Sequence, residues 1–399
     1  MNRFEFYNPV RVIFGAGEVE NVATEAKKFG NKVCLVSYKE LLFLEPLMDR
    51  ITKLLEKEGI EVFPFYEIEA NPEITVVAAG SQYCKDNGVN LVIGVGGGSA
   101  MDAAKVVAAG VYYEGDMWNM VYSRHDGGAS STVPPTKALP LMMIPTLPAT
   151  GSEMNQCAVV SNKALKEKSY IWAACLFPTV SIVDPELTLT LPLKQSAYAA
   201  ADTISHVLEI YINGEEDSDL QHYFQEGVMR TVIDNFPRVM ADPKNVSARS
   251  HLQWAATCAI NGWASPGDAW TPIHQVAHGL TSLHGVPHGA SLAMLMPSWM
   301  ELFSSRRPAR YFRFATNVML VDPTDKTEEA VIAEGIEKFS QFLNDIGAGL
   351  KMSDMGITAE NIPAIVDNAV KVSFGADGYL SCNPPVSKQD VINVLEKAL

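Results

Sequence analysis

The chain has 399 residues, which is long for a single core, so we expect two or more domains. Its residues are 47% hydrophobic and 19% charged, a composition typical of a well-packed globular protein. Its formal net charge of −15 disfavours binding to nucleic acid and to anionic membranes. The N-terminal residues lack a basic-then-apolar signal pattern, and no apolar run has the length of a membrane helix. We therefore expect a cytoplasmic protein that acts on a small molecule.

The first half of the sequence alternates strand-like runs with helical patterns. Amphipathic stretches at 45–58 and 73–87 are suited to be crossover helices between strands. The strand-like runs are rich in Val and Ile and lack polar alternation, which is typical of strands buried on both faces of a sheet. They cover residues 32–38, 61–66, 90–95, 141–146 and 179–184. This order predicts a parallel sheet with a nucleotide-binding topology.

The composition changes after residues 184–192, where strand-like runs give way to helical patterns. We expect the second half to be mainly helical, and we place the domain boundary between residues 187 and 188. The domains are thus 1–187 and 188–399. A cluster of Gly, Ser and Pro at 123–140 predicts a connecting loop. The helical patterns cover residues 194–211, 217–240, 247–262, 307–319, 327–346 and 386–398.

A glycine-rich turn follows the third strand-like run. Gly96, Gly97 and Gly98 precede a helix that we expect to begin near Ser99. Such a turn allows the backbone to approach a diphosphate, which the free N–H groups and the positive end of the helix dipole attract. The spacing matches neither GxGxxG nor a Walker P-loop, so a tight structural turn is the alternative. Asp102 in the first helical turn can either satisfy the dipole or reach a ligand.

A second loop of small and hydroxyl residues follows the fourth strand-like run, at 145–155. Thr146, Thr150 and Ser152 supply hydroxyl groups at the carboxyl end of a strand, where parallel sheets bind their ligands. A helix entry capped by Ser152 is an equal alternative. Two such loops on one sheet favour a dinucleotide more than either loop does separately.

Asp202 and His206 stand four residues apart in a strong helical pattern and therefore share one helix face. A pair of this kind usually serves as an N-cap or as a hydrogen bond. Here three alanines, at 199–201, leave room beside Asp202 for another group to approach. The pair is therefore a candidate for one half of a metal site.

Four further histidines lie close together in the sequence, at His274, His278, His284 and His288. On one straight helix, the fourteen residues from the first to the last would span about 21 Å, too far to share an ion. Glycines at 279 and 285 and a proline at 287 interrupt the stretch, so a helix that ends before 285 can let His288 return beside His274. Asp202, His206 and two of the four histidines would satisfy a metal. The residues alone leave the choice of the two open.

The chain resembles the iron-containing (group III) alcohol dehydrogenases, in the branch of butanol dehydrogenases and broad-range NADPH-dependent aldehyde reductases. The resemblance implies a Rossmann-like N-terminal domain, a helical C-terminal domain, an active-site cleft between them, and a homodimer. It rests on segments in the family's order and spacing: NPVRVIFGAG (8–17), GVGGGSAMDAAK (94–105), IPTLPATGSEMN (144–155), ADTISHVLE (201–209) and IHQVAHGLTSLHGVPHG (273–289).

Carried over position by position, the resemblance implies that Fe²⁺ or Zn²⁺ is bound by Asp202, His206, His274 and His288. It places His278 near the nicotinamide and the substrate, whereas His284 receives no role. With Gly97 of the glycine turn included, the implied cofactor contacts are Asn71, Gly97, Gly98, Ser99, Asp102, Thr146, Leu147, Asn155 and Lys168.

The cofactor choice depends on the residues after the first buried strand. Tyr38 stands where family members that prefer NAD often have an Asp, whose carboxylate would bind the ribose 2′-OH and repel a 2′-phosphate. With Lys39 beside it, the sequence favours NADP over NAD, although Glu40 argues the other way. The expected reaction is hydride transfer between a primary alcohol, such as butanol, and its aldehyde. The alternatives are a glycerol dehydrogenase-like or lactaldehyde oxidoreductase, a dehydroquinate synthase, and a non-redox metal enzyme.

Overall fold

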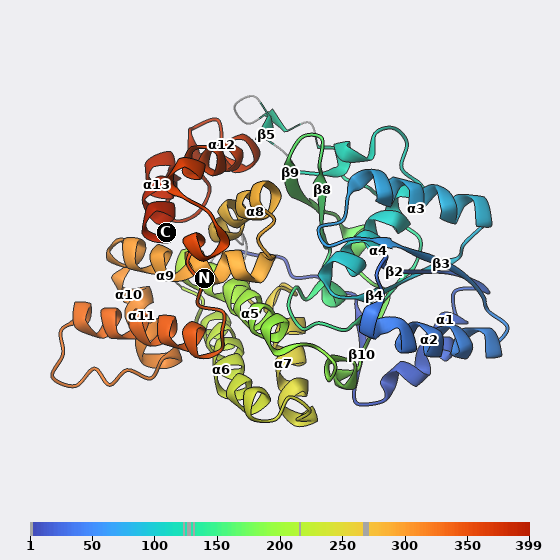
Figure 1. Ribbon diagram of the computed structural model, residues 1–399, viewed down its shortest axis with the longest axis horizontal. Coiled ribbons are helices and arrows are strands. Elements are labelled where there is room, and N and C mark those ends of the chain that lie inside the picture. Colours follow the sequence, from blue (N-terminus) through green and yellow to red (C-terminus); the bar gives the residue numbers. More distant parts are fainter. Residues whose placement is uncertain (1–2, 123, 126–128, 131, 215–216, 266–270) are drawn as a thin grey trace.

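The computed structural model describes residues 3–122, 124–125, 129–130, 132–214, 217–265 and 271–399. The expected loop at 123–140 therefore lies partly outside the described residues. Figure 1 shows a sheet with its covering helices beside a second half built of helices.

One parallel sheet forms the core of the first half. Among the described residues it has six strands in the order β1, β10, β7, β4, β2, β3. The five strand-like runs correspond to five of them, and the sixth, β1, was missed because it is a four-residue edge strand that is only partly buried. The strands are β1 (Arg11–Phe14), β2 (Lys32–Tyr38), β3 (Glu61–Ile68), β4 (Leu91–Gly96), β7 (Leu141–Pro145) and β10 (Val180–Val183).

Helices cover both faces of the sheet, which explains why the central strands show no polar alternation. Val33 and Leu35 of β2 face α1 (Val22–Ala26) and α2 (Glu45–Lys57), whereas Cys34 and Val36 face the opposite core. That second core contains α3 (Ile74–Asn87) and α4 (Gly98–Gly110), which lie on the other side of the sheet in Figure 1. Both crossover helices were predicted to within about one residue.

Among the described residues of the first half, two small antiparallel pairs lie outside the main sheet. The larger one, β8 (Cys157–Asn162) with β9 (Glu167–Trp172), is a hairpin that the sequence analysis missed. The tip of this hairpin reaches the helical half, where the Asn368 side chain donates a hydrogen bond of 3.0 Å to the carbonyl of Lys166. The smaller pair is β5 (Arg124–His125) with β6 (Ala129–Ser130).

The second half is mainly helical, as expected, and it shares one large apolar core. Residues 307–319 do not form a single α-helix, because α10 passes into a π-helical turn at Phe314–Val318. A two-residue strand pair, β11 (Tyr379–Leu380) with β12 (Val386–Ser387), also interrupts the helices. The helices are α5 (Leu193–Asn213), α6 (Asp219–Ala241), α7 (Val246–Ala259), α8 (Pro272–His284), α9 (His288–Phe303), α10 (Pro308–Arg313), α11 (Glu328–Asp345), α12 (Ile362–Ser373) and α13 (Lys388–Lys397). Of the helices described, none combines the length and apolarity needed to cross a bilayer.

Candidate active site

A cleft of about 1700 Å³ lies between the sheet and the helices. Its lining includes the carboxyl ends of β2, β4 and β7, part of β9, and residues of α5, α8 and α9. Ligands of open parallel sheets bind outside the carboxyl ends of the strands, so this is the position expected for a nucleotide. Every residue that we predicted to contact the cofactor or the metal, and also His278, lines this cleft.

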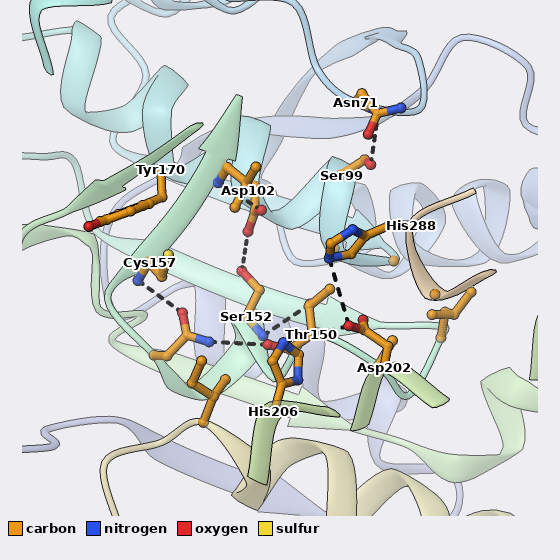
Figure 2. Close-up of a pocket in the computed structure, with 18 of the residues that line it drawn as sticks. Asn71, Ser99, Asp102, Thr150, Ser152, Cys157, Tyr170, Asp202, His206 and His288 are labelled. Atoms are coloured by element: carbon orange, nitrogen blue, oxygen red, sulfur yellow. Dashed lines mark hydrogen bonds and ion pairs between the residues drawn. The ribbon is translucent and has the colours of Figure 1, made fainter. Parts of the chain in front are cut away.

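The glycine turn forms one wall of the cleft. A Cβ atom on Gly98 would lie 2.4 Å from Cγ2 of Thr150, so only glycine allows the two loops to meet. The N–H of Gly97 donates a hydrogen bond of 3.1 Å to the hydroxyl of Tyr38. Asn71, in the left-handed region at φ 59°, donates its N–H to Oγ of Ser99 at 3.2 Å (Figure 2). The helix begins at Gly98, one residue before the predicted start.

Asp102 connects the glycine turn to the second loop. Its buried carboxylate accepts a hydrogen bond from Oγ of Ser152 at 2.7 Å (Figure 2). It also accepts one from the N–H of Val159 at 2.9 Å. Burial raises the pKa of this carboxyl, and the charge of Lys105 opposes the rise. Ser152 lies inside a three-residue 3-10 helix rather than at a cap, so its hydroxyl is available for this contact. Asp102 therefore holds the two loops together at the edge of the cleft.

Lys105 is a structural residue of the site that the sequence analysis missed. Its side chain is fully buried, and its ammonium group donates to the carbonyl of Asn155, to Oδ1 of Asn155 and to the carbonyl of Cys157, at 2.7–3.0 Å. The Asn155 amide in turn donates to the carbonyls of Thr150 and Gly151. A single lysine in the apolar stretch after Asp102 was the signal that could have identified this role.

Lys168 brings a second buried cation into the cleft, from strand β9. Its side chain is 5% exposed, and burial lowers its pKa to about 8 against the opposing effects of Asp202 and Asp102. Lys39, by contrast, is exposed beside Tyr38 at the end of β2.

The structure brings the predicted metal ligands together. Asp202 and His206 lie on α5, and His274 lies on α8; their candidate ligand atoms are within 4.8 Å of one another. The Nε2 atoms of His206 and His274 are each 3.6 Å from Oδ1 of Asp202. All three side chains are buried. Nitrogen and carboxylate oxygen donors at this spacing suit a divalent transition metal.

His288 reaches the same place from a separate helix. Helix α8 ends at His284, Gly285 follows in the left-handed region at φ 68°, and α9 begins at His288. The Nε2 atom of His288 lies 3.8 Å from Oδ1 of Asp202, and Figure 2 shows the two side chains facing each other. The predicted return of the chain is therefore confirmed. The expectation that Gly279 interrupts the helix is wrong, because it lies within α8 and packs against Ile365.

The electrostatics of this cluster favour a cation. Burial lowers the pKa of His206 to about 4 and that of His288 well below its usual value, so both rings are neutral near pH 7. Burial also acts to lower the pKa of His274, but Glu209 and Asp202 outweigh it and raise the pKa to about 9. The same negative field attracts a metal ion. Oδ1 of Asp202 and Nε2 of His274 are buried and lack hydrogen-bond partners among the described residues, so they fit a metal that accepts their lone pairs.

The two remaining histidines of this stretch, His278 and His284, lie in different surroundings. The ring of His278 is buried in the cleft, 5.7 Å from the ring of His288, and burial lowers its pKa well below the usual value. His284 is the last residue of α8 and lies outside the lining of the cleft. Nothing in the structure explains His284.

Glu209 is a further residue that the sequence analysis missed. It lies on α5 three residues after His206, so the helix presents Asp202, His206 and Glu209 on one face. Its fully buried carboxylate contacts Nδ1 of His274. The spacing of the acidic residue after the Asp202/His206 pair was the available signal.

Comparison with known proteins assigns both halves of the chain to one family. The family model described as "Iron-containing alcohol dehydrogenase" matches residues 9–185. The model described as "Fe-containing alcohol dehydrogenase family, C-terminal" matches residues 196–399.

Individual relatives match over nearly the whole length. A probable NADH-dependent butanol dehydrogenase of Bacillus subtilis is 35% identical, with 100% of both chains covered. The NADPH-dependent aldehyde reductase YqhD of Escherichia coli is 30% identical over 92% of both. The crystal structure of NADH-dependent butanol dehydrogenase A from Thermotoga maritima superposes with a TM-score of 0.92 at 34% identity, covering 100% of this chain and 99% of that one.

Proposed function

Because the chain belongs to the iron-containing alcohol dehydrogenase family and is an NAD(P)-dependent alcohol dehydrogenase, we propose that it interconverts primary alcohols and aldehydes such as butanol and butanal. The observation that carries this proposal is the meeting of two sets of residues in one cleft. The glycine turn at the start of α4 and the cluster around Asp202 both line it. The family assignment removes the non-redox alternative.

We propose that Asp202, His206, His274 and His288 hold a divalent cation, Fe²⁺ or Zn²⁺. Three imidazoles and one carboxylate suit both ions. When bound, the cation supplies Lewis acidity toward the oxygen of the substrate, and the nicotinamide donates or accepts the hydride. The chain contributes neutral rings at His206 and His288, whose lowered pKa leaves one nitrogen of each ring with a free lone pair.

The nucleotide is proposed to lie along the glycine turn. The N-terminus of α4 and the buried ammonium of Lys168 supply positive potential for a diphosphate. Asp102 and Lys105 hold the two loops in place through buried hydrogen bonds. The ring of His278 is buried beside His288, and we assign it to the substrate side, where it positions the reacting carbon or moves a proton through a ring nitrogen.

We propose NADPH as the preferred cofactor. Tyr38 supplies no carboxylate to repel a 2′-phosphate, and its hydroxyl is already engaged by the N–H of Gly97. The exposed ammonium of Lys39 is adjacent and can attract that phosphate. Relatives that are 33–35% identical carry NADH in their names, so the preference for NADPH would set this chain apart from them.

The variant His274→Ala tests the metal site. We expect it to lose bound metal and turnover together, because one ligand is removed, while NADPH binding persists on the glycine turn. Metal content is measured by mass spectrometry, turnover with butanal, and NADPH binding by fluorescence titration. The matched control is His251→Ala, which removes an exposed histidine on α7 and should behave as the parent. Full activity in His274→Ala would contradict the assignment.

The domain boundary at 187/188, the homodimer and the cytoplasmic location stay predictions.

A further inference from the structure

We propose that Glu209 is a positioning residue that fixes the ring of His274 for metal binding and sets the start of α8. The proposal rests on the metal site proposed above. Glu209 is 0% exposed and lies on α5, 64 and 65 residues before the two backbone groups that it contacts on α8. A buried carboxylate is costly unless its partners are well placed, so these contacts carry the argument.

The carboxylate first acts as a cap for α8. One oxygen, Oε2, accepts the N–H of Ile273 at 2.6 Å and the N–H of His274 at 3.3 Å. These belong to the first helical turn, whose N–H groups have no partner inside the helix. The residue before the helix, Thr271, makes no side-chain cap among the described contacts. Glu209 therefore does from a neighbouring helix what an N-cap side chain normally does.

The other oxygen acts on the histidine ring. Oε1 of Glu209 contacts Nδ1 of His274. An ionised carboxylate can only accept, so Nδ1 carries the hydrogen and Nε2 keeps its lone pair. That Nε2 points at Oδ1 of Asp202 across 3.6 Å, at the centre of the proposed site. The ring is thus held in the tautomer and orientation that a metal ligand needs.

The two carboxylates also strengthen the negative field of the site. Asp202 and Glu209 both lie buried beside the ring of His274, so together they favour a cation there. Removal of either buried carboxylate weakens that field.

Glutamine cannot replace both functions of Glu209. Its amide has a single acceptor oxygen, and its NH₂ group only donates. If the oxygen accepts the N–H groups of α8, the NH₂ group faces Nδ1 of His274 and favours the wrong tautomer. If the oxygen turns to the ring, the NH₂ group opposes two backbone donors. Glu209→Gln preserves shape and packing but loses the arrangement.

The test compares Glu209→Gln with Glu226→Gln. Glu226 is a buried carboxylate on α6 that pairs with Arg313 and accepts the hydroxyl of Tyr211, outside the cleft. Metal-free protein is titrated with Co²⁺ against a competing chelator, and the visible absorption spectrum of the bound ion is recorded. We expect Glu209→Gln to bind about 10–100-fold more weakly with a changed spectrum. Glu226→Gln should match the parent, and both variants should bind NADPH normally.

Each outcome is decisive. If the parent binds no Co²⁺, the proposed metal site fails and the role of Glu209 fails with it. If the parent binds and Glu209→Gln binds equally tightly with the same spectrum, Glu209 is only a helix cap and the inference alone is overturned. Should Glu209→Gln not fold, imidazole ¹⁵N spectra of the Zn²⁺-loaded parent decide: a protonated Nδ1 on His274 supports the inference, and a protonated Nε2 overturns it.

Discussion

Buried charges of both signs line the cleft. Asp202 and Glu209 create a negative field around His274, and this field raises the pKa of that ring to about 9. Lys168, 5% exposed, and the start of α4 provide the positive groups for an anionic ligand. A cation and a dinucleotide can therefore bind side by side in one cleft.

The preference between NADPH and NADH is a prediction at the scale of single residues. We expect a lower KM for NADPH than for NADH in the parent, and a reversal in Lys39→Asp, because the new carboxylate repels a 2′-phosphate and accepts a ribose hydroxyl. A shift of roughly tenfold in the ratio of the two KM values corresponds to about 1.4 kcal/mol. Lys53→Asp on α2 makes the same charge change at an exposed position outside the cleft and serves as the control. A parent that prefers NADH would show that the interpretation of Tyr38 and Lys39 is wrong.

At the scale of elements, the site depends on how helices begin and end. The break between α8 and α9 lets two histidines that are fourteen residues apart face one carboxylate. Gly285 makes this break possible because its φ of 68° is strained for residues with a side chain. The glycine turn at the start of α4 similarly depends on the loop that Lys105 holds in place.

The variant Lys105→Met tests the link between α4 and that loop. Methionine fills similar space but leaves the carbonyls of Asn155 and Cys157 without their buried donor. We expect the free energy of unfolding to fall by about 1–3 kcal/mol and NADPH to bind more weakly, with metal affinity retained. Thermal unfolding and NADPH titration measure both effects, and Lys85→Met, exposed on α3, is the control. Unchanged NADPH binding would show that Lys105 does not support the loop that binds the nucleotide.

At the scale of the whole molecule, the hairpin β8–β9 connects the sheet to the helical half across the cleft. Glu167 on β9 is 1% exposed and pairs with Lys371 on α12 at 2.6 Å. The hydrogen bond from Asn368 to Lys166 lies beside this ion pair. The two halves are thus joined by polar contacts whose acidic member is buried.

Lys371→Met should lower the free energy of unfolding by about 1–3 kcal/mol, because it leaves the buried carboxylate of Glu167 without its cation. The double variant Lys371→Met/Glu167→Gln should recover part of this loss, since the uncompensated charge is gone. Thermal unfolding of the parent, both single variants and the double variant forms a complete cycle. Additive effects of the two substitutions would show that the pair does not couple the halves.

Local patterns predicted much of this protein. Residues 33–36 and 91–95 are uniformly apolar because helices cover both faces of the sheet, and this burial is visible in composition alone. The spacing of Asp202 and His206 and the break at Gly285 and Pro287 follow from helix geometry. Each depends on residues that are neighbours in the chain, so the sequence carries the information directly.

Contacts between distant segments decided the rest. The edge strand β1 forms only because β10, about 170 residues later, offers it a partner, and the hairpin β8–β9 was missed for lack of a local turn signal. The structure brings His288 close to Asp202 through the packing of α9 near α5. The roles of Glu209 and Lys105 depend on their partners on other elements. A buried charge is defined by what surrounds it, and tertiary packing alone supplies those surroundings.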